Sequence, residues 1–243
     1  MLKQIKSAVL AVLGLVMLAL PAPVAHAEGN VVVVELYTSQ GCNACPPADE
    51  MLGQLAGRDD VIALSLHVDY WDYLGWRDTF AKRQFAKRQV AYRDAWHKSV
   101  VYTPQIVVQG SHEVAGNHPK DLTAAIDAAL QDVPPINVTV ERQGGMLKCR
   151  IEPGSERMVG IIWIAKYTKS ATVEISRGEN AGRTITYMNV VTSLNRIGSW
   201  AGNEIEDVAM PQPGPGEGVA IWVQSGENGP IMAAAKIENP LVK

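Results

Sequence analysis

Residues 31–49 read VVVVELYTSQGCNACPPAD, and this stretch decides the fold of the N-terminal half. It begins with a β-branched run, which is typical of a strand buried on both faces of a sheet. Residues 39–41 interrupt the run, and two prolines then open a helical stretch from about residue 48 to residue 56. Proline is tolerated in the first turn of a helix, where its missing N–H has no partner to lose. Cys42 and Cys45 therefore lie between a buried strand and the start of a helix.

The spacing of Cys42 and Cys45 allows the two sulfurs to meet at the first helical turn. Free N–H groups and the positive end of the helix dipole both stabilise a thiolate there. In such motifs the thiol pKa falls from about 8.5 to roughly 3.5–7.5. We therefore predict that Cys42 is the attacking nucleophile and that Cys45 resolves the mixed disulfide. A structural disulfide and a metal site are the alternatives for the same pair.

The elements expected downstream of the cysteines alternate between strands and helices. In chain order they are an apolar strand at 61–69, a basic helix at 77–98, a hairpin of strands at 105–108 and 112–115, and a helix from an N-cap at Asn117 to about residue 130. The first two strands are expected to be parallel, because their crossover contains a helix. The order β-α-β-α-β-β-α predicts an α/β, thioredoxin-like N-terminal domain over residues 28–133.

In that fold, one edge of the sheet gathers the cysteines, the end of the second strand and the start of the third. Thr103 and Pro104 would then face the cysteine pair and offer backbone edges to a peptide substrate. Tyr70 and Trp71 either wall a substrate groove or pack beneath the loop.

The end of the second expected strand carries a histidine and an acid. His67 and Asp69 alternate onto one strand face. They would relay a proton to or from Cys45 or form a satisfied polar pair.

The N-terminus has the pattern of a secretory signal peptide over residues 1–27. Lys3 and Lys6 precede an apolar run at 8–20, and Ala25-His26-Ala27 forms an A-x-A cleavage site. The run is shorter than the about 20 residues that a transmembrane helix needs. Cleavage removes two lysines and no acid, which changes the formal net charge from −3 to −5. We expect a periplasmic or secreted protein that is not inserted in the membrane after cleavage and is not a nucleic-acid binder, because such binders are basic.

The second half of the chain has a different sequence pattern. A stiff linker at 133–135 is followed by short strand-like runs separated by Gly and Pro, with no long helical period. These features predict a mainly antiparallel, β-sandwich-like domain over residues 134–243. The third cysteine, Cys149, alternates with Lys148 and Arg150 in one of these runs, which predicts a buried, inert thiol.

Several motifs resemble a family of bacterial secreted proteins of unknown function with a thioredoxin-like domain. They are YTSQGCNACPPAD (37–49), HVDYWDYLGW (67–76), VYTPQ (101–105), RGENAGRT (177–184) and TYMNVV (186–191). The resemblance covers most of the chain that follows the signal peptide. It implies export and a thioredoxin-like fold, and it implies no particular reaction.

The leading hypothesis is a periplasmic thiol–disulfide oxidoreductase that uses Cys42 and Cys45 and needs no cofactor. Its partners would be a protein or small-thiol substrate and a second redox protein. One alternative is a copper-handling module, in which the two thiolates and His67 or His112 bind Cu(I). Another is a binding module in which the cysteines form a permanent disulfide.

Overall fold

The computed structural model describes residues 30–239, so the predicted signal peptide lies outside the described residues. The first half follows the expected order of strands and helices, with one short 3-10 helix inserted. Its elements are β1 (Val32–Thr38), α1 (Pro46–Leu55), β2 (Val61–His67), η1 (Asp72–Leu74), α2 (Arg83–Ala95), β3 (Gln105–Val108), β4 (His112–Ala115) and α3 (Pro119–Gln131).

Strand β1 is buried on both faces, as its β-branched sequence predicts. Val32, Val34 and Leu36 pack in the core beneath α1 and α3. Val33 and Tyr37 point to the other face, where α2 contributes to the core. β1 pairs in parallel with β2 and antiparallel with β3, because a helix connects β1 to β2 and the chain has reversed by β3.

Helix α2 is shorter than the helix expected over residues 77–98. The segment before it is a loop, in which the Asp78 carboxylate accepts hydrogen bonds from the N–H groups of Phe80 and Ala81. An Asp side chain that binds nearby N–H groups competes with helix formation. The helix therefore begins at Arg83 rather than at residue 77.

The second half contains seven strands. They are β5 (Asn137–Gln143), β6 (Met146–Glu152), β7 (Gly160–Glu174), β8 (Thr184–Trp200), β9 (Glu206–Pro211), β10 (Glu217–Gln224) and β11 (Ile231–Asn239). The sequence predicts only short strands here, but β7 and β8 are long, with 15 and 17 residues.

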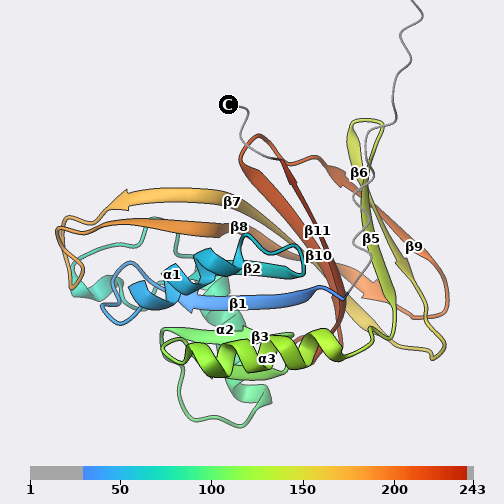
Figure 1. Cartoon of the computed structure of the whole chain (residues 1–243), viewed down its shortest axis with the longest axis horizontal. Helices are drawn as coiled ribbons and strands as arrows, with labels where there is room; N and C mark the ends of the chain where they lie inside the picture. Colours follow the sequence, from blue (N-terminus) through green and yellow to red (C-terminus); the bar gives the residue numbers. More distant parts are fainter. Residues whose placement is uncertain (1–29, 240–243) are drawn as a thin grey trace, which may run out of the picture.

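The strands of the two halves form one mixed sheet in the order β11-β10-β7-β8-β2-β1-β3-β4 (Figure 1). Most neighbours are antiparallel, and the junction is a parallel contact at which Ser65 of β2 pairs with Val190 of β8. The sheet therefore continues across residue 134, and strands of the second half extend the sheet of the first half. The reason lies in β2, which is buried along its whole length and needs a neighbour on each edge.

The other three strands form a small antiparallel sheet in the order β5-β6-β9. It packs against β7, β10 and β11 through a second apolar core, at the end of the molecule away from α1 (Figure 1). Cys149 lies fully buried in this core. Burial raises the pKa of its thiol to about 12, so the predicted inert thiol is confirmed as a buried one.

A buried ion pair joins α2 to the sheet. Arg88 donates from Nε to Glu35 Oε1 at 2.7 Å and from Nη2 to Glu35 Oε2 at 3.1 Å. Nη2 also donates to the hydroxyl of Tyr92 and to Oε1 of Gln224. The ion pair therefore connects strands from both halves of the chain. No helix within residues 30–239 is long and apolar enough to cross a membrane.

Candidate functional site

The two cysteines of the first motif form a disulfide at the start of α1. Cys45 is the N-cap residue, and its carbonyl accepts hydrogen bonds from the N–H groups of Ala48 and Asp49. The N–H of Cys45 donates in turn to the carbonyl of Cys42 at 3.2 Å. This short turn brings the sulfurs together at the positive end of the helix. Only 3% of Cys42 is exposed, and Cys45 is fully buried.

Thr103 and Pro104 lie beside the cysteines, as the order of elements predicts. The peptide bond between them is cis. The carbonyl oxygen of Thr103 is 3.8 Å from Cys42 Sγ. Trp71 donates from Nε1 to Thr103 Oγ1 at 2.7 Å, and its Cβ lies so close to Gly41 that a side chain at Gly41 would meet it at 3.1 Å. Trp71 therefore reaches from one side of Cys42 to the other.

The aromatic residues near this edge divide into two roles. Tyr70 is half-buried and donates to Gln89 Oε1 at 3.2 Å, so it packs beneath the loop. Tyr73 is largely exposed and stacks on Trp71 with ring centroids 6.3 Å apart. Trp71 and Tyr73 thus form an aromatic surface next to Thr103.

A buried acid lies one helical turn after the second cysteine. Asp49 shares a face of α1 with Cys45 and Leu52, and this face packs into the core. Neither carboxyl oxygen of Asp49 has a hydrogen-bond partner among the described residues. Burial raises the pKa of Asp49 to about 7, although the nearby His67 ring and the Thr38 hydroxyl oppose the increase. A carboxyl group in this state exchanges a proton near neutral pH.

His67 lies at the end of β2, fully buried beside this acid. Its Nδ1 is 2.8 Å from Asp78 Oδ2, which also accepts the N–H of Gln40 at 2.7 Å. Burial tends to raise the pKa of Asp78, but His67 and the hydrogen bonds hold it below its usual value. An ionised carboxylate only accepts, so Nδ1 of His67 donates to it. The other ring nitrogen, Nε2, has no partner among the described residues.

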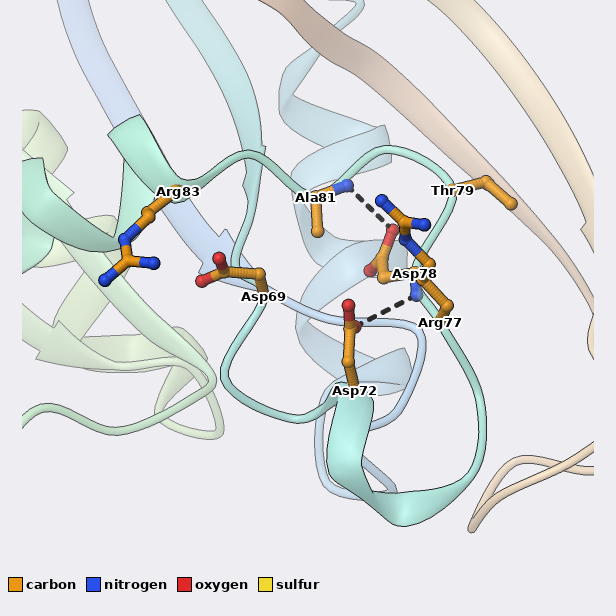
Figure 2. Close-up of a pocket in the computed structure, with 7 residues that line it drawn as sticks. All are labelled: Asp69, Asp72, Arg77, Asp78, Thr79, Ala81 and Arg83. Atoms are coloured by element: carbon orange, nitrogen blue, oxygen red, sulfur yellow. Dashed lines mark hydrogen bonds between the residues drawn. The ribbon is translucent and has the colours of Figure 1, made fainter.

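The expected pairing of His67 with Asp69 is replaced by the pairing with Asp78. Strand β2 ends at His67, so the alternation of side chains does not continue to Asp69. Asp69 instead lines a surface pocket of about 620 Å³ with Asp72, Arg77 and Asp78. Figure 2 shows Asp69 on the side of Arg83 and the other carboxylates across the pocket.

The turn between β7 and β8 reaches the cysteine motif from the second half of the chain. Asn180 in this turn is 1% exposed. Its Nδ2 donates to the carbonyls of Gln40 and Cys42, both at 2.9 Å. Tyr187 of β8 also packs on the His67 ring, with centroids 4.8 Å apart. The site is therefore built by both halves of the chain.

The described residues contain no group of three or more His, Cys, Asp or Glu side chains arranged to hold a metal ion. His112, a candidate copper ligand, is exposed on β4 beside Ser111. His67, the other candidate, is engaged by Asp78. The copper alternative therefore gains no support from the arrangement of these side chains.

The model of a family described as a protein of unknown function, DUF1223, matches residues 33–224. The chain belongs to this family. A crystal structure of a protein from Agrobacterium tumefaciens is similar at 30% identity, over 89% of this chain and 97% of that one, with a TM-score of 0.76. HBP35 of Porphyromonas gingivalis is similar over 88% of this chain and 78% of that one, with a TM-score of 0.65 and 13% identity, which shows a shared fold alone. The search of curated proteins found no match.

In this DUF1223 protein, the expected membership of a family of unknown function is confirmed. Sequence reasoning missed three residues of the site, Asp49, Asp78 and Asn180. Asp49 had a signal, because it falls on the apolar face that Cys45, Leu52 and Ala56 define at helical spacing. Asn180 lies in the RGENAGRT motif at 177–184, but the motif does not reveal its partners, because the carbonyls of Gln40 and Cys42 are about 140 residues earlier in the chain.

Proposed function

We propose that this protein is an exported, thioredoxin-like thiol–disulfide oxidoreductase that acts through Cys42 and Cys45. The observation that carries the proposal is the juxtaposition of their disulfide with the buried, unpartnered carboxyl of Asp49. A disulfide that only staples the chain has no need of such a group, whose burial is unfavourable. A redox-active pair needs a proton acceptor and donor close to the buried sulfur.

The thioredoxin-like part of the proposal rests on residues 32–131. Their strands pair in the order β2-β1-β3-β4, with helices on both faces of β1. The cysteines follow β1, and the Thr103 carbonyl comes to Cys42 from the start of β3. This arrangement places a disulfide and a peptide backbone edge side by side.

In the reducing direction, the Cys42 thiolate attacks one sulfur of a substrate disulfide. A mixed disulfide forms, and the other substrate sulfur leaves as a thiolate that takes up a proton. Cys45 then gives its proton to the Asp49 carboxylate, and its thiolate attacks Cys42 Sγ. The protein disulfide forms, and the second substrate sulfur leaves and is protonated. The protein dithiol is oxidised by two electrons, the substrate disulfide is reduced, and the reverse sequence runs in the oxidising direction.

His67 and Asp78 would support this proton transfer. The Asp78 carboxylate fixes the His67 ring, and the ring lies close enough to Asp49 to lower its pKa. His67 thereby keeps Asp49 within reach of ionisation at neutral pH. This replaces the relay expected from His67 and Asp69, because Asp69 lies on the pocket surface.

The substrate would approach along Thr103 and the aromatic surface of Trp71 and Tyr73. Because Cys42 is nearly covered, a bound substrate must displace the Trp71 indole from Thr103. An extended peptide has the N–H groups and side chains to replace this hydrogen bond and stack on Tyr73. We therefore propose a protein substrate, with a second redox protein that resets the pair in the periplasm or outside the cell.

The test is reduction or oxidation of a model protein disulfide by the mature chain. We expect wild type to exchange, Cys42→Ser to lose the activity, and Cys45→Ser to accumulate a mixed disulfide that is visible on a non-reducing gel. Cys149→Ser is the matched control, because that thiol is buried in the other core, and it should keep full activity. Asp49→Asn should slow exchange by about 10²–10⁴-fold, the usual contribution of a general acid or base.

Two results would overturn the proposal. One is a wild type that shows no exchange in either direction. The other is a Cys42–Cys45 disulfide with a potential below about −300 mV, which is typical of a permanent structural bond.

A further inference from the structure

The turn between β7 and β8 makes a specific contact with the redox motif. Asn180 is buried, and its Nδ2 uses both of its N–H bonds on carbonyls about 140 residues earlier, those of Gln40 and Cys42. Backbone bonds hold the turn itself in place, including Ala181 N–H to Gly178 O and Arg183 N–H to Asn180 O. Asn180 is therefore presented by a rigid hairpin end and not by a loose loop.

The contact acts on the atom that closes the cysteine turn. The Cys42 carbonyl accepts one hydrogen bond from Cys45 N–H at 3.2 Å and a second from Asn180 at 2.9 Å. Asn180 also fixes the carbonyl two residues earlier, at Gln40. These bonds hold the backbone on both sides of Cys42, so they restrict the position of its sulfur relative to Cys45.

We propose that Asn180 is a positioning residue that holds the Cys42–Cys45 turn closed and so stabilises the disulfide relative to the dithiol. The stability of a disulfide depends on the effective concentration of one thiol at the other, which rises when the backbone between them is fixed. A residue of the second half thereby lowers the reduction potential of the Cys42–Cys45 pair in the first half. The effect of Asn180 on the disulfide does not depend on the proposed function, but its biological role rests on it.

Two further contacts show that the hairpin end fits this place. Gly178, with φ +77°, lies so close to Trp76 that an added Cβ would meet the Trp76 Cβ at 3.2 Å. Trp76 donates in turn to Gln40 Oε1 at 2.8 Å. The hairpin end, the loop after β2 and the segment before Cys42 therefore form one packed unit around Asn180.

The measurement is the equilibrium of the protein with glutathione buffers, in which the protein disulfide and two glutathione thiols become the protein dithiol and one glutathione disulfide. We expect Asn180→Ala to favour the dithiol by about tenfold, roughly the worth of one neutral hydrogen bond. For a two-electron couple, tenfold corresponds to a rise of 29.6 mV in reduction potential. Asn180→Ser, which keeps one donor, should give a smaller rise.

Asn189 provides the matched control. It is also a buried Asn of the second half, and its Nδ2 donates to the Ala63 carbonyl at 2.9 Å, away from the cysteines. Its φ is +48°, so Asn189→Gly removes the side chain without backbone strain. We expect this variant to lower the melting temperature and leave the glutathione equilibrium unchanged.

The inference is overturned if the Asn180 variants keep the wild-type equilibrium, or if Asn189→Gly shifts it equally. Because the equilibrium is measured without a protein substrate, it is independent of the exchange assay. A tenfold shift in a protein without exchange activity supports the role of Asn180 and defeats the proposed enzyme. Exchange activity together with an unshifted equilibrium supports the proposed enzyme and defeats the role of Asn180.

Discussion

Two buried acids flank the same part of the sheet, and their surroundings are opposite. Glu35 on β1 accepts two hydrogen bonds from Arg88 and one from the Tyr92 hydroxyl at 2.7 Å. Asp49 on α1 accepts none among the described residues. Burial alone therefore does not distinguish them, because both side chains are removed from water.

The difference separates a structural acid from the acid that carries the proton in the proposed function. The Glu35 carboxylate has its hydrogen bonds made and is fixed in one place, where it joins α2 to the sheet. The Asp49 carboxyl group has no such partners and a pKa of about 7, so it can take up or release a proton near neutral pH. Glu35 lies where its partner Arg88 connects the two halves of the chain, and Asp49 lies one helical turn after the disulfide.

Breaking the structural pair should give the largest loss of stability. Arg88→Met leaves the buried Glu35 without its cation, which should lower the free energy of unfolding by about 3–5 kcal/mol. Urea unfolding measures this loss. The double variant Glu35→Leu with Arg88→Met should recover most of it, because no buried charge is then left unpaired. A loss below about 1 kcal/mol for Arg88→Met, judged against such pairs, would contradict the assigned role.

Removing the reactive acid should have the opposite sign and a dependence on pH. The folded pKa of Asp49, about 7, lies above its unfolded value of 3.8, so the protein binds the proton more tightly when folded. The resulting stability is full below pH 3.8 and is lost as the pH rises to about 7. Relative to Asp49→Asn, wild type should therefore lose roughly 3–4 kcal/mol between pH 4 and pH 7.

The pH profile is measured by urea unfolding of the disulfide form of both proteins in parallel. Subtracting the two profiles removes the contributions of all other titrating groups. A flat difference between pH 4 and pH 7 would show that Asp49 ionises normally and would remove the contrast with Glu35.

A smaller effect should follow from trimming one partner of the structural acid. Tyr92→Phe removes a hydroxyl that donates to Glu35 and accepts from Arg88 and Gln224. The loss of hydrogen bonds to charged groups should cost about 1–2 kcal/mol in the free energy of unfolding. The glutathione equilibrium of the cysteines should not move, which separates this cluster from the redox site. A shift in that equilibrium would show that the two clusters are coupled.

The cysteine motif was predictable because its signals are local. A β-branched run, a turn and a proline-led helix place Cys42 and Cys45 from neighbouring residues alone. Thr103, just before β3, was placed by the order of the elements. The helix face of Asp49 was also readable, since an acid interrupts an apolar period. The sequence-based interpretation treated that segment only as a helix and did not ask which residue faced inward.

The rest depended on pairings between residues far apart in the chain. His67 pairs with Asp78 because the loop after β2 folds back toward the end of the strand. Hydrophobic periodicity in the sequence gives no sign of this fold-back. The edge of β2 is filled by β8, so strands that look like a separate domain extend the first sheet. Asn180 acquires its partners only through that pairing, so the RGENAGRT motif of the β7–β8 turn could be recognised in the sequence while its contact with Gln40 and Cys42 could not.

The place of β8 beside β2 also bears on how the protein is made. β2 ends at His67 and β8 begins at Thr184, so β2 cannot pair with β8 until residues 68–183 have been synthesised. Until then this mostly apolar strand has an unpaired backbone edge, which is the kind of surface that aggregates. A chain truncated after residue 133 would keep that edge open for good. Completion of the candidate site and protection of the nascent chain thus depend on one late event of strand pairing.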